Sequence, residues 1–292
     1  MQFRLVLAAS RPRKNAFFLH LVLRISIETF VLGHLGLVTE VTEPSKAAIP
    51  SRIVRTSLAP PTPPANRVSP MITGGRWELL PPLNEVVDAC KVLGKSFFQL
   101  GFLPKAIFLE RLERDPRSIN VFFLLSVLSV SARFTASLID RYGDGLKASQ
   151  VFMDRPATLV PEEMYLPSIE CIQAFFLLAI SEWGKGDKTL SRVHMGIAVR
   201  IAGILRLHRE DTYRLPDDAS GEEIVMSEMA RRTFWMLESQ DNLHSGFTSP
   251  ISFSPADITT LLPSNESDFT FGNIPAERSA LAGTLIAKKD HL

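Results

Sequence analysis

The chain has 292 residues, of which 46% are hydrophobic and 22% are charged, so it can bury a sizeable core in one large domain or two small ones. Residues 1–76 carry ten Lys and Arg against three Glu, a net charge of +7, whereas residues 77–292 carry 22 basic against 28 acidic groups, a net charge of −6. An acidic folded part repels a polyanion on average, which disfavours DNA contact through residues 77–292.

Residues 1–43 form a leader that is basic at its start and apolar in its second half. Because its first acidic residue is Glu28, a mitochondrial transit peptide is one interpretation, and a disordered or wrongly assigned leader is the favoured one. A membrane span is disfavoured since His20 and Arg24 interrupt the apolar stretch.

Residues 44–82 contain nine of the chain's twenty prolines. Proline removes a backbone donor and blocks helix propagation, so this segment is predicted to be an extended, disordered linker. The folded part is then expected to be one helical domain over residues 83–283.

The two cysteines, Cys90 and Cys171, each lie in an apolar helical context. We interpret both as buried thiols that pack as small hydrophobic groups. Two isolated cysteines make no disulfide framework, which favours a reducing, intracellular compartment. No Cys-x-x-Cys pair occurs, and a binuclear zinc cluster needs six closely spaced cysteines, so we expect no zinc and no other cofactor in this chain.

From residue 83 onward, apolar periodicity and helix-stop signals predict an all-α, irregular multi-helix fold without strands. The predicted helices cover residues 84–100, 105–113, 118–138, 143–153, 167–182, 187–206 and 222–246. Two of them contain runs that are apolar on every side, Val121–Val130 and Ala174–Ile180. Both runs are too short to cross a bilayer, so other helices must surround them.

Helix 187–206 has a predicted inner stripe: Leu190, Val193, His194, Ile197, Ala198, Ile201, Ile204 and Leu205. His194 is interpreted as a hydrogen-bonded core histidine because no second metal-binding residue lies one turn away. Gly196 and Gly203 predict close backbone approach by another helix, since a helical glycine costs roughly 1 kcal/mol relative to alanine. The cations at the helix end, among them His208, complement the negative pole of the helix dipole.

Helix 222–246 separates into an apolar arc and a charged arc. Glu228 is spaced to form ion pairs with Arg231 and Arg232, each worth a few tenths of a kcal/mol if exposed. Arg231 precedes Trp235 by one turn and is expected to lie on its ring.

Trp235 stands among charges, which leaves two interpretations. It packs beneath the loop 247–257, or it marks a partner surface. Packing is favoured because the loop is adjacent and carries Phe247 and Phe253. Asp241 is then expected to hold loop amides or an arginine.

No constellation predicts catalysis. The stretch 184–189 lacks the spacing of a phosphate-binding loop and follows a helix rather than a strand. The carboxylate pairs Glu162-Glu163 and Asp217-Asp218 are neighbours in sequence, so they make poor acid/base pairs and are expected in solvated loops. The six histidines are scattered, and the chain is therefore predicted not to be an enzyme.

Four patches occur in order: Pro167-Ser168-Ile169-Glu170 with Gln173; Met195–Ala202; Leu207-His208-Arg209-Glu210; and Glu228 with Arg231-Arg232, Trp235 and Asp241. Together they resemble the middle regulatory domain of fungal binuclear zinc-cluster (xylanolytic-activator-type) transcription factors over Val86–Gly283. The resemblance implies a helical domain that regulates transcription in the nucleus. Zinc and DNA binding belong, in that family, to a zinc-cluster domain that this sequence does not contain.

The resemblance also implies structural signature residues, none of them catalytic, cofactor-binding or metal-binding. They are Gln173, Trp183, Gly196, Arg200, His208, Arg231, Arg232, Trp235, Asp241, Pro250 and Asp257.

The leading hypothesis is a non-enzymatic transcription regulator whose helical domain senses a small-molecule effector or contacts partners. The candidate partners are the transcription machinery, co-regulators and a second copy of the chain. DNA would be reached only through a separate zinc-cluster domain. The alternative hypothesis is a helical, mitochondrially targeted enzyme or scaffold protein. Truncation of the domain at its carboxyl end is also kept open, with apolar helix surface left bare.

Overall fold

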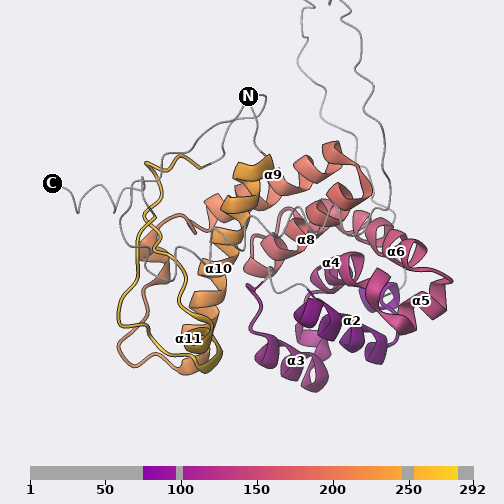
Figure 1. Cartoon of the computed structure of the whole chain (residues 1–292), viewed down its shortest axis with the longest axis horizontal. Coiled ribbons are helices and arrows are strands. Elements are labelled where there is room, and N and C mark those ends of the chain that lie inside the picture. The colour runs from indigo at the N-terminus through magenta and orange to yellow at the C-terminus, as the bar shows by residue number, and fades with distance from the viewer. Residues whose placement is uncertain (1–74, 97–100, 245–252, 282–292) are drawn as a thin grey trace, which may run out of the picture.

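A computed structural model describes residues 75–96, 101–244 and 253–281 (Figure 1). The leader and most of the proline-rich segment, with their predicted disorder, lie outside these residues. In the described part of the proline-rich segment, residues Arg76–Leu79 form a 3₁₀ turn, η1. Arg76 forms ion pairs with Glu162 and Glu163.

The described residues contain helices and no strand, so the prediction of an all-α fold is confirmed. In chain order, η1 is followed by α2 (Leu83–Ser96), α3 (Lys105–Arg114), η3 (Pro116–Ser118), α4 (Val121–Ser131), η4 (Ala132–Phe134), α5 (Ala136–Tyr142), α6 (Gly145–Ala157), α7 (Val160–Glu163), α8 (Ile169–Lys185), α9 (Lys188–Ile204), η5 (Glu210–Tyr213), α10 (Gly221–His244) and α11 (Glu266–Phe271).

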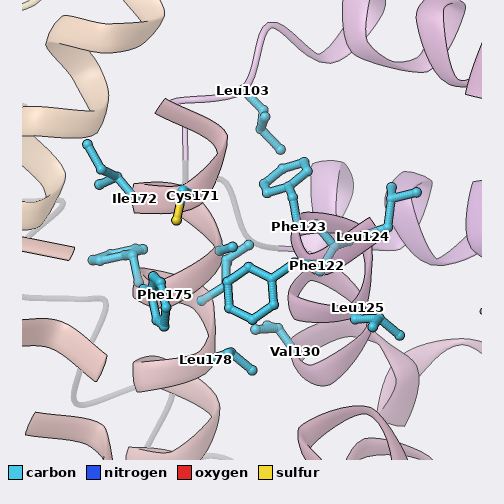
Figure 2. Packing of buried hydrophobic residues seen from close by; sticks show 14 of the residues in the cluster. Leu103, Phe122, Phe123, Leu124, Leu125, Val130, Cys171, Ile172, Phe175 and Leu178 are labelled. Carbon is cyan, nitrogen blue, oxygen red and sulfur yellow. The ribbon is translucent and has the colours of Figure 1, made fainter. Parts of the chain in front are cut away.

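The core is built around α4 and α8, whose apolar sides face each other (Figure 2). Every residue of α4 is buried, including its serines, as its lack of a polar face predicts. Phe122 of α4 meets Phe175 of α8 edge to face, with 4.9 Å between the ring centroids. The hydroxyls of Ser129 and Ser181 are 2.7 Å apart across the same interface, so the buried serines are hydrogen-bonded.

The predicted helix 118–138 is wrong as a single element, because it divides into α4, η4 and α5. The side chain of Asn120 caps α4, accepting from the Phe122 N–H at 2.7 Å. The hydroxyls of Ser131 and Thr135 donate back to carbonyl oxygens four residues earlier. Such bonds compete with the helical ladder and bend helices, and α4 with η4 meets α5 at 87°.

Two other helix ends differ from the predictions. Pro156, expected beyond the end of the predicted helix 143–153, lies in the last turn of α6, and Gly184, expected beyond the end of the predicted helix 167–182, lies within α8. The residue that ends α8 is Gly186, whose φ of +96° is the left-handed conformation that glycine adopts without strain. Within the described ranges, no single helix is long and apolar enough to cross a membrane.

The buried side of α9 differs from the predicted stripe. Leu190, Val193 and Ile204 are exposed, and the buried residues are Ser191, His194, Met195, Ala198, Val199, Ile201 and Ala202. The buried side mixes small and large residues, and the Ser191 hydroxyl donates to the Ala179 carbonyl oxygen of α8 at 2.7 Å. Burial in α9 therefore does not follow the size or the hydropathy of its side chains alone.

His194 is buried and its Nδ1 lies 2.9 Å from Glu182 Oε2, which confirms a hydrogen-bonded core histidine. The prediction for Gly196 is wrong, because among the described residues no atom beyond its own stretch of helix lies within 4 Å of the position that its Cβ would take. The nearest group to a Cβ at Gly203 is the Phe253 ring at 3.9 Å, a side chain instead of the backbone of another helix.

Figure 1 shows the segment that follows α10, including α11, looping beside α10 on the side away from α2–α6. This segment, residues 253–281, has little helix of its own. It packs over the charged arc of α10, and we call it the cover over α10.

Candidate functional site

Much of the charged arc of α10 is buried, so the weak ion pairs of an exposed arc do not apply. Glu228 and Arg231 are each 3% exposed. They are covered by residues 261–278, to which their side chains are bonded. Charged groups are almost never fully buried without partners, so the arrangement of those partners defines the candidate site.

Arg231 forms the centre of the network. Its guanidinium donates to both carboxylate oxygens of Glu210, at 2.6 and 2.7 Å, and to the Leu261 carbonyl oxygen at 3.0 Å. Its Cζ lies 4.2 Å from the centroid of the Tyr213 ring. The expected contact with the Trp235 ring is therefore wrong: Arg231 is held by η5, which the sequence did not identify as an element.

Arg232, the next residue, joins three segments that are distant in sequence. It donates to Glu266 at 2.8 Å, to the Ser264 carbonyl oxygen at 3.0 Å and to the Gly101 carbonyl oxygen at 3.1 Å. Its Cζ also lies 4.1 Å from the Phe269 ring centroid. One side chain thus links α10, the start of α11 and the chain before α3.

Glu228 balances the arginines. Its Oε1 accepts from the Ser264 N–H at 2.7 Å and from Arg232 at 3.4 Å, and its Oε2 lies 2.7 Å from Arg278 and 3.7 Å from Arg231. The Arg278 and Arg231 contacts are charge contacts without hydrogen-bond alignment. The predicted pairing of Glu228 with both neighbouring arginines is confirmed, but in a buried setting. Three arginines meet three carboxylates here, Glu210, Glu228 and Glu266, so the site is formally neutral.

Trp235 is buried, and its indole N–H donates to the Leu261 carbonyl oxygen at 2.8 Å. Packing within the chain, the favoured interpretation, is therefore confirmed. Leu261, the residue that Trp235 bonds, lies beyond the expected loop 247–257. Residues 247–252 of that loop are outside the described residues. Asp241 lies half-buried near the end of α10, and its expected role in holding loop amides or an arginine stays a prediction.

His208 lies four residues beyond the end of α9, which stops at Ile204, and its expected contribution at the negative pole of the helix dipole stays a prediction. Its carbonyl oxygen accepts from the Thr259 N–H at 2.9 Å, and its ring stacks on Phe253 at 5.4 Å. Burial, followed by the nearby charge of Arg209, lowers the pKa of His208 below its ordinary value of 6.5. The ring therefore favours the neutral form and packs against Phe253 of the segment that covers α10.

The other signature residues lie apart from this network. Gln173 is buried in α8 and donates to the Thr233 hydroxyl of α10 at 2.9 Å. Trp183 is half-buried with Lys188 over its ring, and Gly196 and Arg200 are exposed on α9. Asp257 is exposed, and Pro250 lies outside the described residues.

Sequence reasoning missed most of the partners that complete the site. They are Glu210, Tyr213, Leu261, Ser264, Glu266, Phe269 and Arg278. Glu210 was within a recognised patch, but no periodicity relates it to Arg231, 21 residues later. The carbonyl oxygens carry no sequence signal at all, since every residue has one.

Three ionisable groups outside the network, Glu163 and the two cysteines, are buried in the described part of the chain. Glu163, expected in a solvated loop, is fully buried between Arg76 and Asn120 Nδ2. Cys90 and Cys171 are buried free thiols, as predicted, and burial raises the pKa of each to about 12. The described residues contain no group of three or more His, Cys, Asp or Glu side chains that could hold a metal ion.

Comparison with known proteins identifies the family of this helical domain. A family model described as the fungal specific transcription factor domain matches residues 95–283. The chain belongs to this family. The match covers α3 to α11 and every member of the buried arginine network.

Individual relatives agree with this assignment. The chain is 26% identical over 201 residues to a transcriptional regulatory protein of Schizosaccharomyces pombe, covering 65% of this chain and 20% of the relative. It is 25% identical over 198 residues to a Zn(2)-C6 fungal-type transcription factor of Fusarium oxysporum, with 66% and 20% covered. It is 32% identical over 125 residues to a pigment biosynthesis transcriptional activator of Monascus ruber, with 40% and 22% covered.

The chain thus spans about a fifth of the length of these relatives. No solved structure matches it significantly.

Proposed function

We propose that this chain acts as a non-enzymatic regulatory domain that controls transcription in the nucleus. The observation that carries the proposal is the match of residues 95–283 to the fungal specific transcription factor domain. The three relatives named above are all transcription regulators, and nothing in the described residues favours the mitochondrial alternative. DNA contact would fall to a zinc-cluster domain outside this sequence, where zinc would also be bound.

The proposed mechanism uses the cover over α10. Arg231, Arg232 and Trp235 hold residues 261–266 through side chains buried beneath that segment. A partner or effector that binds better when the segment is seated, or when it is displaced, shifts the balance between the two arrangements. Candidate partners remain the transcription machinery, co-regulators, a small-molecule effector and a second copy of the chain.

A reporter experiment tests this proposal. The full chain is fused to an unrelated DNA-binding domain and a constitutive activation domain, and reporter output is compared with that of the same fusion without the chain. We expect the chain to change reporter output, and Arg231→Met to remove part of that change. Arg214→Met is the matched control, because Arg214 is an exposed arginine with only a 3.5 Å contact to Asp211.

Equal reporter output with and without the chain, at equal protein levels, would refute the regulatory role. Imaging the full chain with a carboxyl-terminal tag tests the location separately. We expect nuclear signal, and mitochondrial signal would support the alternative hypothesis instead.

A further inference from the structure

A small cavity lies between the second half of α2 and the start of α3, two helices that pack against each other in the lower part of Figure 1. Its volume is about 140 Å³. An engineered apolar cavity of about 150 Å³ in another protein binds one benzene molecule, so this cavity has room for a ligand of that size.

Apolar groups form the walls of the cavity. Leu93 and Leu103 are buried in the main core, and Phe108 and Leu109 are half-buried against it. The Phe108 ring is fixed by an edge-to-face contact with Phe123 of α4, with 5.8 Å between the ring centroids. A hydrocarbon group that enters the cavity therefore leaves water for an apolar surface that is already in place.

Gly94 of α2 leaves this space open. A Cβ at Gly94 would lie 3.6 Å from Cδ of Lys105, which is an ordinary contact, so the described residues leave room for a side chain here. The φ of Gly94 is not positive, and glycine is a poor helix former, so the backbone of α2 does not require it. A larger residue at this position would occupy the cavity, and its absence is what keeps the cavity available to a ligand.

The solvent side of the cavity carries three ammonium groups. Lys91, Lys95 and Lys105 line it and are exposed, and none of the described lining residues is acidic. Lys105 shares one face of α3 with the two apolar wall residues that follow it by three and four positions. Lys91 lies 3.5 Å from Glu113, whereas Lys95 and Lys105 form no ion pair within the described ranges. Two positive charges are therefore available to a ligand at the edge of an apolar cavity.

We propose that this cavity binds a small apolar monocarboxylate, with its hydrocarbon body between α2 and α3 and its carboxylate at Lys95 and Lys105. The volume limits the body to about one six-membered ring or a chain of about six carbons. The lysines select the carboxylate, because an amine of the same shape is repelled and a neutral amide gains little from the two charges. The proposal rests on the proposed regulatory function, for which it names the class of effector and its site.

The cavity is connected to the arginine network through the chain before α3. Leu103 forms part of the cavity wall, and the carbonyl oxygen of Gly101, two residues earlier, accepts from Arg232 of α10 at 3.1 Å. A ligand that contacts Leu103 therefore acts on a segment that α10 holds. If the ligand binds the two arrangements of the cover over α10 unequally, its occupancy shifts the balance between them.

Isothermal titration calorimetry with the full chain tests the site. The ligands are benzoate and hexanoate, which carry one carboxylate on an aromatic and an aliphatic body. The comparison compounds are benzamide, which lacks the charge, benzylamine, which reverses it, and acetate, which lacks the body. We expect the better carboxylate to bind with a Kd of roughly 0.1–1 mM, at least about tenfold more tightly than any comparison compound. Added salt should weaken its binding, since charges on exposed lysines are screened.

Two variants locate the binding. Gly94→Leu places a side chain in the cavity and should weaken carboxylate binding at least about tenfold, and leucine is a better helix former than glycine, so α2 itself is not weakened. Lys95→Gln with Lys105→Gln should weaken carboxylate binding about tenfold and remove most of its salt dependence, at an unchanged Tm, a combination that loss of folding cannot produce. Lys185→Gln, at an exposed lysine that ends α8, is the matched control and should change nothing.

The proposal is overturned if benzamide binds as tightly as benzoate and hexanoate, because the lysines then select nothing. Equal binding of acetate would show that anions only adsorb to surface lysines, and it overturns the proposal too, as does a Gly94→Leu variant that behaves like Lys185→Gln. Absence of carboxylate binding with the reporter effect intact would remove this site and leave the regulatory function standing. Carboxylate binding without any reporter effect of the chain would keep the site and remove the regulatory function.

Discussion

Replacing Arg231 by methionine tests whether the buried network holds the C-terminal segment on α10. The change removes two short bonds to Glu210, one bond to the Leu261 carbonyl oxygen and the contact with the Tyr213 ring. Removing one partner of a buried ion pair typically costs about 3–5 kcal/mol, because the other charge is left without compensation. The Glu210 side chain is 30% exposed and water can reach it, so we expect the lower end, about 3 kcal/mol.

Urea and thermal unfolding, followed by circular dichroism, measure the effect. For a folded part of this size, a loss of about 3 kcal/mol corresponds to a fall in Tm of roughly 6–12 °C. Arg231→Lys keeps the charge but loses the two-pronged geometry, so it should fall between the wild type and Arg231→Met. In a double-mutant cycle, Glu210→Gln should cost less in the Arg231→Met background than alone.

The reasoning is refuted if Arg231→Met costs no more than Arg214→Met. Arg214 is exposed and its contact with Asp211 is long, so its loss should change the free energy of unfolding by less than about 0.5 kcal/mol. A large effect of Arg231→Met combined with full additivity in the cycle would place the energy outside the Glu210 pair.

Trp235→Phe removes the indole bond to Leu261 and should lower the free energy of unfolding by about 1–2 kcal/mol in urea titrations; an unchanged midpoint contradicts this. Burial lowers the pKa of His208, so the unfolded state binds more protons between the lowered pKa and the ordinary 6.5. Stability should therefore fall as the pH drops through that window, with a shallower slope in His208→Asn; equal slopes would rule out this residue as the cause. Gly272→Ala should destabilise, since φ is +65° and the new Cβ would lie 2.5 Å from a carbonyl oxygen. Gly196→Ala, with open space around it, should instead stabilise by about 1 kcal/mol in thermal melts.

Sequence reasoning predicts the helical core well because apolar runs leave few alternatives. The residues of α4 are apolar on every side, and a helix of that kind must lie in the middle of a helical domain. The same reasoning fails to place the break after Ser131, where α4 gives way to η4 and the hydroxyls of Ser131 and Thr135 bond back to the main chain. Hydropathy counts such residues as neutral and does not reveal the break.

The orientation of α9 could not be read from hydrophobicity because its size pattern and its hydropathy pattern conflict. Leu190 and Val193 are more apolar than Ser191 and Ala198, yet the smaller pair is the buried one. Whether a helix buries its large or its small residues depends on the surface that it meets, which its own sequence does not contain.

The charged arc of α10 illustrates a second limit. An exposed charged face and a buried one have the same periodicity, and only the covering segment distinguishes them. Residues 253–281 have little regular structure, so no periodic pattern of apolar residues predicts that they pack on α10. Arg231, Arg232 and Trp235 belong to a patch that the sequence singles out, while their bonding partners are visible only in the fold.

The cover over α10 is held largely through its main chain. Arg231 and Trp235 share the carbonyl oxygen of Leu261, Arg232 binds that of Ser264, and Arg278 binds that of Leu262. Every residue has a carbonyl oxygen whatever its side chain, so the path of this segment tolerates substitutions in its own sequence. The helix beneath has no such freedom, because guanidinium and indole groups cannot be exchanged for others of like geometry. Sequence differences between paralogues should therefore accumulate in residues 253–281 and be fewer at Arg231, Arg232 and Trp235 of α10.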